Sequence, residues 1–392
     1  MSEKTIKMDK IRSHIDGFVS EMVEIRHDIH AHPELAFEEK RTSELVANLL
    51  AEWGFEVTRG FGKTGVIGTL RAGDGKKSIG LRADMDALPI HEETNLPYAS
   101  KYAGKMHACG HDGHTTILLT AARYLAETKN FNGTVHLIFQ PAEENFGGGL
   151  TMVKEGLFEK FPCDVVYGLH NWPGIATGTV QVRSGPTMAS VDTVYVTLTG
   201  KGGHGAQPHT TVDPIVAGAS IVMGLQTIVS RNVPPVEPAV ITTGLFQGGT
   251  ISNVIPGTVK MELTVRSLSQ KVRKLLEERI RTLINDQAAS FNASAEIRYE
   301  RGYPVLVNSE KETAFVEEIA QQLLGKKQVS RVPEPVMGSE DFSYMLEKCP
   351  GSYLFMGTGE GADVHNPGYV FNDEIIPIGG SLWGALVEAY LR

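Results

Sequence analysis

The sequence predicts an α/β protein with a mostly parallel sheet, interrupted by an inserted, ferredoxin-like α+β domain. Helical and strand-like patterns alternate through the N-terminal third, as in a parallel sheet covered by helices. Near Gly185 the order changes to strand, helix, two strands, helix, strand, which is the ferredoxin-like order. The chain also has 392 residues, whereas a single core stops growing at about 250–300 residues. We therefore expect two domains.

The elements of the first domain follow from the spacing of apolar residues. Helical spacing predicts helices at residues 15–29, 41–53 and 115–127. Short apolar runs predict strands at residues 65–70, 78–81, 135–139 and 165–169. After the insertion, the chain returns to this layer with a helix at 310–324, a strand at 352–356 and a helix at 378–391. The first domain is therefore expected to comprise residues 1–186 and 302–392.

The inserted domain is expected at residues 187–301. Alternating or apolar runs predict strands at 193–199, 239–245, 259–267 and 295–300. Helical spacing predicts helices at 215–229 and 270–289. A glycine-rich loop, GKGGHGAQPH, lies between the first strand and the first helix.

Charge and cysteine content exclude some partners and locations. A net charge of -9 argues against nucleic acid or a membrane as partner, because both need a basic face. Residues 1–20 are charged and lack the apolar stretch of a signal peptide. The longest apolar run, residues 212–229, is interrupted by polar residues. Three cysteines without CxxC spacing predict no disulfide framework, so a reducing, cytoplasmic location is expected.

Four residues with metal-binding side chains crowd one short segment, just ahead of the helix predicted from Thr115. They are His107, Cys109, His111 and His114. In extended backbone, residues two apart point to the same side, so Cys109 and His111 are expected to reach one spot. Thiolate and imidazole both bind zinc and its first-row neighbours. The alternative is a polar loop of histidines with ordinary hydrogen bonds.

A pair of acidic residues, Glu143 and Glu144, follows the strand that ends near Gln140. Adjacent carboxylates repel each other unless a positive charge lies beside them. A metal ion would provide that charge: one carboxylate binds it while its neighbour serves as general base towards water. The alternative is a surface pair of acids.

Other metal-binding residue types follow separate strands. His170 ends the strand at 165–169, His365 follows the strand at 352–356, and Asp84 and Asp86 follow the strand at 78–81. Ligands of open α/β sheets gather at the carboxyl ends of the strands. A site with Cys109, His111, Glu144, His170 and His365 has one ligand more than a tetrahedral zinc accepts. The sequence therefore predicts two metal ions that share a bridging ligand.

These segments resemble peptidase family M20, which contains the aminoacylases, and within it the amidohydrolase subfamily. The resemblance runs from RHDIHAHPELAFEE to DVHNPGYVFNDE and so covers nearly the whole chain. It rests on a specific order of motifs: RADMDALP, HACGHDGH, QPAEE, GLHNW, GGHGAQPH, SNVIPG, MGSEDF and VHNP. It implies a metallo-exopeptidase-type catalytic domain whose inserted domain serves as lid and dimerisation domain.

The resemblance also implies roles for site residues. The metal ligands would be Cys109, His111, Glu144, His170 and His365, and Glu143 would be the general base. Two divalent ions per subunit are expected, zinc or else manganese, cobalt or nickel. Asp84 stands where relatives have a ligand histidine, so its role stays open. Asp86 is expected to orient a ligand.

The inserted domain is expected to contribute His204, Asn253 and Arg266. His204 resembles the family histidine that approaches the substrate carbonyl, often from a partner subunit, where it would stabilise an oxyanion. Asn253 and Arg266 match substrate-binding positions, and Arg266 suits a carboxylate. The alternatives are a turn residue for Asn253 and a solvated charge for Arg266. A homodimer or homotetramer formed through this domain is expected.

The function expected from these residues is metal-dependent hydrolysis of N-acyl amino acids. Close alternatives are a dipeptidase, a carboxypeptidase or an N-acetyldiaminopimelate deacetylase with the same two-metal mechanism. A more distant alternative is a catalytically silent binding protein on the same fold. Another is a hydrolase with Cys109 as nucleophile, which chelation alone would not inactivate.

Overall fold

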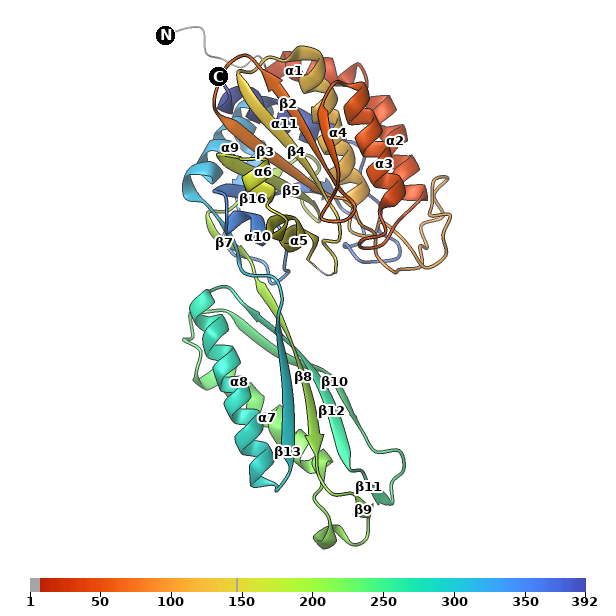
Figure 1. Cartoon of the computed structure of the whole chain (residues 1–392), viewed down its shortest axis with the longest axis vertical. Coiled ribbons are helices and arrows are strands. Elements are labelled where there is room, and N and C mark those ends of the chain that lie inside the picture. Colours follow the sequence, from red (N-terminus) through yellow and green to blue (C-terminus); the bar gives the residue numbers. More distant parts are fainter. Residues whose placement is uncertain (1–7, 146) are drawn as a thin grey trace. The chain divides into compact units, whose positions relative to one another are not determined.

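The computed structural model describes residues 8–145 and 147–392, so the start of the segment inspected for a signal peptide lies outside the described residues. The chain divides into two compact units (Figure 1). The first comprises Met1–Gly185, Val307–Pro333 and Asp341–Arg392, and the second comprises Pro186–Leu306 and Glu334–Glu340. The connecting segments hold the short strands β7 (Gly185–Met188) and β14 (Leu306–Asn308).

The first unit is built on a mixed sheet with a parallel centre. Its strands, in spatial order, are β1 (Glu56–Phe61), β2 (Gly65–Ala72), β4 (Gly133–Gln140), β3 (Ser78–Asp84), β5 (Val165–Pro173), β16 (Gly351–Gly359), β6 (Val180–Val182) and β15 (Val329–Arg331). The central strands β4, β3, β5 and β16 run parallel to one another. Their carboxyl ends therefore meet at one edge of the sheet, and the predicted α/β class is confirmed.

Helices cover both faces of this sheet (Figure 1). One face carries α3 (Lys40–Glu52), α4 (His111–Thr128), α11 (Ile375–Tyr390) and α9 (Glu310–Leu324), with α1 (Met8–Asp16) and α2 (Val19–Ala31) packed onto them. The other face carries α5 (Gly148–Lys154), α6 (Leu157–Lys160) and α10 (Ser343–Leu346). Alternate residues of β5 face the two layers: Tyr167 donates a hydrogen bond to α9, whereas Gly168 lies under Phe342 beside α10.

Two helices differ from the sequence prediction. The helix expected at 15–29 is broken at Gly17 and Phe18, because glycine is a poor helix former and the last turn of α1 closes with a hydrogen bond from Gly17 N to His14 O. The helix expected from Thr115 begins at His111, directly after Gly110, whose φ is +89°. A Cβ at Gly110 would lie 2.4 Å from the side chain of Asn171, so only glycine fits this turn. The prediction that Cys109 and His111 lie in extended backbone is therefore wrong.

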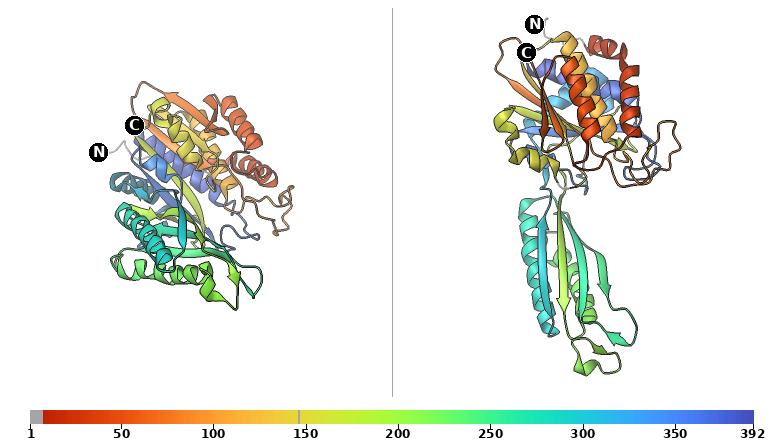
Figure 2. Two further views of the ribbon diagram at one scale, coloured as in Figure 1. Left: turned by 60° about the horizontal axis from the view of Figure 1, so that its bottom comes forward. Right: turned by 45° about the vertical axis from the view of Figure 1, so that its right-hand side comes forward.

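The second unit is a sheet covered on one face by two helices (Figure 2). Its strands, in spatial order, are β10 (Ala239–Gly248), β12 (Thr258–Ser267), β8 (Ser190–Thr199) and β13 (Ser294–Arg301), all antiparallel. The helices are α7 (Pro214–Arg231) and α8 (Gln270–Ser290). This order confirms the predicted ferredoxin-like arrangement. The glycine-rich loop adds a small pair of strands, β9 (Gly203–His204) and β11 (Val254–Ile255).

Helix α7 is long and apolar enough, by length and composition, to cross a membrane. This is weak support for a membrane span, because a core helix passes the same test. Its Ile221, Leu225 and Ile228 are fully buried in the core of the second unit.

Candidate metal centre

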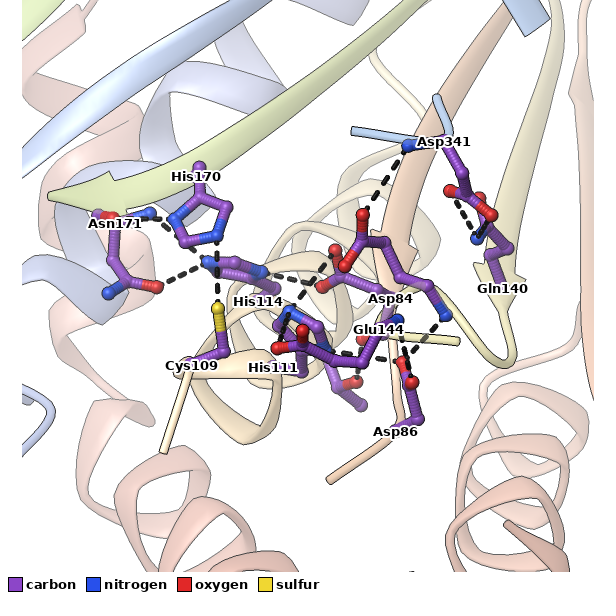
Figure 3. A network of polar contacts seen from close by, with 12 residues as sticks. Asp84, Asp86, Cys109, His111, His114, Gln140, Glu144, His170, Asn171 and Asp341 are labelled. Carbon is purple, nitrogen blue, oxygen red and sulfur yellow. Dashed lines mark hydrogen bonds and ion pairs between the residues drawn. The ribbon is translucent and has the colours of Figure 1, made fainter. Parts of the chain in front are cut away.

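Polar side chains from four parallel strands meet at the carboxyl edge of the first unit's sheet (Figure 3). Asp84 ends β3, Glu143 and Glu144 follow β4, His170 lies near the end of β5, and His365 lies in the loop after β16. His365 has a φ of +66°, a strained value for a residue other than glycine that the surrounding structure must hold in place. The convergence predicted from the strand ends is therefore present.

The predicted ligands form two groups that share Cys109. Cys109, His111 and His170 make one group, and Cys109, Glu144 and His365 make the other. In each group the candidate ligand atoms lie within 4.8 Å of one another. These two groups would be able to hold two divalent ions, with Cys109 available to both.

The residues present fit such a pair of ions. His111 Nε2 and Glu144 Oε1 are buried, and among the described residues neither atom has a hydrogen-bond partner. Leaving a buried polar atom unpaired is costly, and a pair of divalent cations, one in each group, would satisfy one atom each. Imidazole, thiolate and carboxylate together are a donor set for zinc and neighbouring transition metals.

The electrostatics of the site also favour a cation. Burial lowers the pKa of His111, but the carboxylates of Asp84 and Asp86 outweigh burial and raise this pKa to about 10. Burial and the nearby carboxylates of Glu144 and Glu143 raise the pKa of the Cys109 thiol well above its usual value. Without a cation beside it, the thiol stays protonated, which argues against Cys109 as a free nucleophile.

Asp86 ties the glutamate pair to a histidine. Its Oδ1 accepts a hydrogen bond from Glu143 N and its Oδ2 accepts one from Glu144 N, both at 3.0 Å (Figure 3). His111 Nδ1 also donates to Asp86 Oδ1, at 3.3 Å. One buried carboxylate therefore orients the ring of His111 and the backbone of both glutamates.

Asp84 is engaged by a different set of partners. Arg82 Nη1 donates to its Oδ2 at 2.7 Å, and His114 Nδ1 donates to its Oδ1 at 2.6 Å. His111 Nε2 lies 3.7 Å from Asp84 Oδ2. Asp84 therefore holds His114 against Asn171. Asp84, His111 and His114 also form a group that could hold a metal ion.

Sequence reasoning missed Arg82 and the carboxylate of Asp341. Arg82 donates to Gln140 Oε1 at 2.9 Å and to Asp341 Oδ1 at 3.0 Å. The backbone N–H of Asp341 donates to Glu143 Oε1 at 3.4 Å. The signal in the sequence was Arg82 itself. A charged residue inside an otherwise apolar strand is buried only when it has partners, so this arginine indicated buried acceptors nearby.

Of the two histidines in the N-terminal RHDIHAHPELAFEE segment that end helix α2, His30 supports helix α4. His30 Nδ1 donates to Asp112 Oδ2, and Arg26 Nη1 donates to the same oxygen, both at 2.9 Å. Asp112 lies in the first turn of α4, between His111 and His114. His32 instead contacts the backbone of its own helix.

The remaining predicted residues lie in the second unit. His204 of β9 and Asn253 are close, since Gly205 N donates to Asn253 O at 2.8 Å. Ala206 N donates to His204 Nδ1, so in the neutral ring the proton is on Nε2. Arg266 lies at the opposite end of β12 and is not brought together with His204.

Known proteins share this chain's sequence and fold. The model of the family described as "Peptidase family M20/M25/M40" matches residues 80–389. Hippurate hydrolase of Campylobacter jejuni is 44% identical over 95% of this chain and 97% of its own length. N-acetyl-L-cysteine deacetylase of Bacillus subtilis is 40% identical over 95% of this chain and 88% of its own length.

The solved structure of the Bacillus subtilis YXEP protein, named as a dinuclear metal-binding peptidase of the M20 family, is also similar. It has a TM-score of 0.84 and 34% identity, covering 96% of this chain and 99% of that chain. Its described two-metal character agrees with the two ligand groups around Cys109. With a family model spanning most of its length and relatives this similar, the chain belongs to peptidase family M20/M25/M40 and is one of its amidohydrolases.

Proposed function

We propose that this amidohydrolase cleaves the amide bond of N-acyl amino acids, releasing a carboxylic acid and a free amino acid. The observation that carries the proposal is the pair of ligand groups sharing Cys109, with the buried Glu143 beside them. Hippurate hydrolase and N-acetyl-L-cysteine deacetylase, both named for N-acyl amino acid substrates, support this substrate class.

In the proposed mechanism, Cys109, His111 and His170 would hold one ion, and Cys109, Glu144 and His365 the other. Two bound divalent ions would supply Lewis-acid chemistry, polarising the scissile carbonyl and making water more acidic.

The proton transfers are assigned to Glu143. Its Oε1 is held by the backbone N–H of Asp341, and its own N–H is held by Asp86. Glu143 would take a proton from the attacking water and later deliver one to the nitrogen of the leaving amino acid.

Three residues of the second unit are proposed to act on the substrate. We assign to His204 the stabilisation of the oxyanion, because its Nε2 carries the donor proton in the neutral ring. Asn253 and Arg266 are proposed to bind the substrate, with Arg266 suited to the amino acid carboxylate.

Zinc is the proposed metal, because a thiolate ligand favours a soft ion, with manganese, cobalt or nickel as alternatives. Elemental analysis of the purified enzyme, followed by reloading of the chelated protein with each ion, tests this assignment. We expect zinc to restore activity. Activity restored by manganese, cobalt or nickel but not by zinc would contradict the assignment.

We also propose that residues 187–301 act as lid and dimerisation domain of a cytoplasmic homodimer or homotetramer. The outer side of α7 supports this assembly: Val216 is 51% exposed and Met223 is 72% exposed. Strand β10 is also an edge strand, which has free backbone groups to pair with a second copy.

A substrate panel tests the proposed function. Hydrolysis of hippurate, N-acetyl amino acids, N-acetyldiaminopimelate and dipeptides is compared at equal enzyme concentration, before and after chelation. We expect the highest kcat/KM for a simple N-acyl amino acid and loss of activity on chelation. A preference for dipeptides, or activity that survives chelation, would contradict the proposal.

A further inference from the structure

Glu39 lies directly before helix α3 but does not cap it. That task belongs to Glu34, whose two oxygens accept hydrogen bonds from Arg41 N at 2.9 Å and Thr42 N at 2.8 Å. The side chain of Glu39 is turned inward instead and is fully buried, with 0% exposure. A buried carboxylate in this position calls for partners elsewhere in the fold.

Two of those partners, Thr64 and Ala142, lie in other loops, and the third, Phe37, lies two residues before Glu39. Glu39 Oε1 accepts hydrogen bonds from Ala142 N at 2.9 Å and from Phe37 N at 3.0 Å, and Oε2 accepts one from the hydroxyl of Thr64. Both backbone donors belong to residues with left-handed conformations, since φ is +62° at Phe37 and +54° at Ala142. Such backbone is strained in residues other than glycine and persists only where its surroundings hold it.

The strained Ala142 sits between β4 and the glutamate pair. Glu39 holds the N–H of Ala142, and Asp86 holds the next two N–H groups, those of Glu143 and Glu144. On the other side, Gly148 N donates to Ala142 O at 3.0 Å. The backbone angles at Ala142 decide the direction in which the side chain of Glu143 leaves the turn.

We propose that Glu39 is a positioning residue for Glu143 and acts on it through the backbone of Ala142. The inference rests on the proposed role of Glu143 as general base. Removing the acceptor for Ala142 N lets the turn relax out of its left-handed conformation. Glu143 then moves relative to the attacking water, whereas Asp86 keeps its contacts with Glu144 N and His111 Nδ1.

The experiment compares Glu39→Ala with Glu39→Gln and with the matched control Glu34→Ala. Glu39→Ala removes both backbone contacts, and we expect kcat to fall about 10–100-fold, because small displacements of a catalytic group are that costly. KM is expected to stay within about twofold, with metal content unchanged by elemental analysis. Glu39→Gln keeps an oxygen for Ala142 N and is expected to restore most of kcat.

Glu34→Ala also removes an acceptor of two backbone N–H groups, but these lie at the start of α3. It is expected to lower the melting temperature without a selective loss of kcat. If Glu39→Ala yields no folded protein, Glu39→Asp takes its place, because the shorter side chain keeps the charge and no longer reaches Ala142 N. An equal fall in kcat in Glu39→Ala and Glu34→Ala overturns the inference. Loss of metal from Glu39→Ala in parallel with its loss of kcat also overturns it.

Hydrogen exchange measured by mass spectrometry gives a readout independent of activity. In Glu39→Ala, exchange is expected to increase in peptides covering residues 141–145; in Glu34→Ala it should increase only around residues 40–43. Increased exchange at 141–145 in a protein inactive on the whole substrate panel would leave the positioning role standing and remove the proposed function. Unchanged exchange at 141–145 in an enzyme that is active on the panel would remove the positioning role and leave the proposed function standing.

Discussion

Glu143 and Glu144 are neighbours in the chain, yet their side chains have different surroundings. Glu144 Oε1 lies 3.2 Å from His365 Nε2, within a group of potential ligands. Glu143 also belongs to a candidate group, with His111 and Glu144, but its Oε1 accepts the backbone N–H of Asp341. Asp86 holds the backbone of both, so the two side chains leave a common anchor.

Glu143→Gln separates proton transfer from metal binding. The amide keeps the shape of the side chain but cannot accept a proton, so we expect kcat to fall about 10²–10⁴-fold. Metal content, measured by elemental analysis, is expected to stay at the wild-type level. The matched variant Glu144→Gln should lose metal as well as activity. Near-normal turnover by Glu143→Gln would remove Glu143 from the role of base.

Cys109→Ser tests the shared sulfur. Because Cys109 belongs to both ligand groups, we expect this variant to lose affinity for both ions rather than for one. Metal content after dialysis against a mild chelator is the measurement. Cys163→Ser, a change outside the ligand groups, serves as control and should keep the wild-type content. Unchanged occupancy in Cys109→Ser would show that the thiol is not a ligand.

Strand β4 shows how an element divides its residues between two environments. Val135, Leu137 and Phe139 are buried in the main core, whereas His136 packs against Phe161 on the other side. Thr69 on β2 contacts His136 Nδ1 at 2.9 Å. Burial, with a smaller contribution from Arg71, lowers the pKa of His136 to about 4. The ring is therefore neutral in the folded protein at neutral pH.

This pKa predicts a pH dependence of stability. Between pH 6.5 and 4 the unfolded chain binds a proton at His136 that the folded protein does not, so the unfolding free energy falls as the pH falls. We expect His136→Gln to reduce this slope by up to about 1.4 kcal/mol per pH unit. Urea denaturation across pH 4–7 measures it. His91→Gln, at an exposed position, should leave the slope unchanged; an equal effect of both variants would contradict the assignment.

The second unit, taken as a whole, leaves apolar surface uncovered. Helix α7 buries Ile221 and Leu225 against its own sheet but exposes 72% of Met223. The neighbouring edge strand β10 adds unpaired backbone groups. A second copy of the chain would cover both features, which is why we place the proposed dimer contact here.

Met223→Lys tests this contact, because a charge buried at an apolar interface is strongly unfavourable. We expect light scattering coupled to size-exclusion chromatography to show a dimer for the wild type and a monomer for the variant. Thr282→Lys adds the same charge on the exposed side of α8 and should leave the dimer mass measured by light scattering unchanged. A wild-type monomer, or a dimer that survives Met223→Lys, would rule out this assembly.

Much of the fold and of the candidate site was predictable from local patterns. The strands that end at or just before Asp84, Glu144 and His170 were placed because apolar runs and the polar residues after them are local features. The start of α4 was not, because His111 enters the helix through the left-handed turn at Gly110. The break between α1 and α2 was missed for a similar reason: the apolar pattern continues through it.

The sequence by itself therefore determined the fold class, the chemical types of the candidate ligands and their places at the ends of parallel strands. These follow from composition and short-range periodicity. Tertiary structure alone decided that Cys109 is common to both ligand groups, that Asp84 is held by Arg82 and His114, and that Glu39 reaches Ala142. Such contacts join residues far apart in the chain. Their partners are set by how the layers pack, which no local pattern encodes.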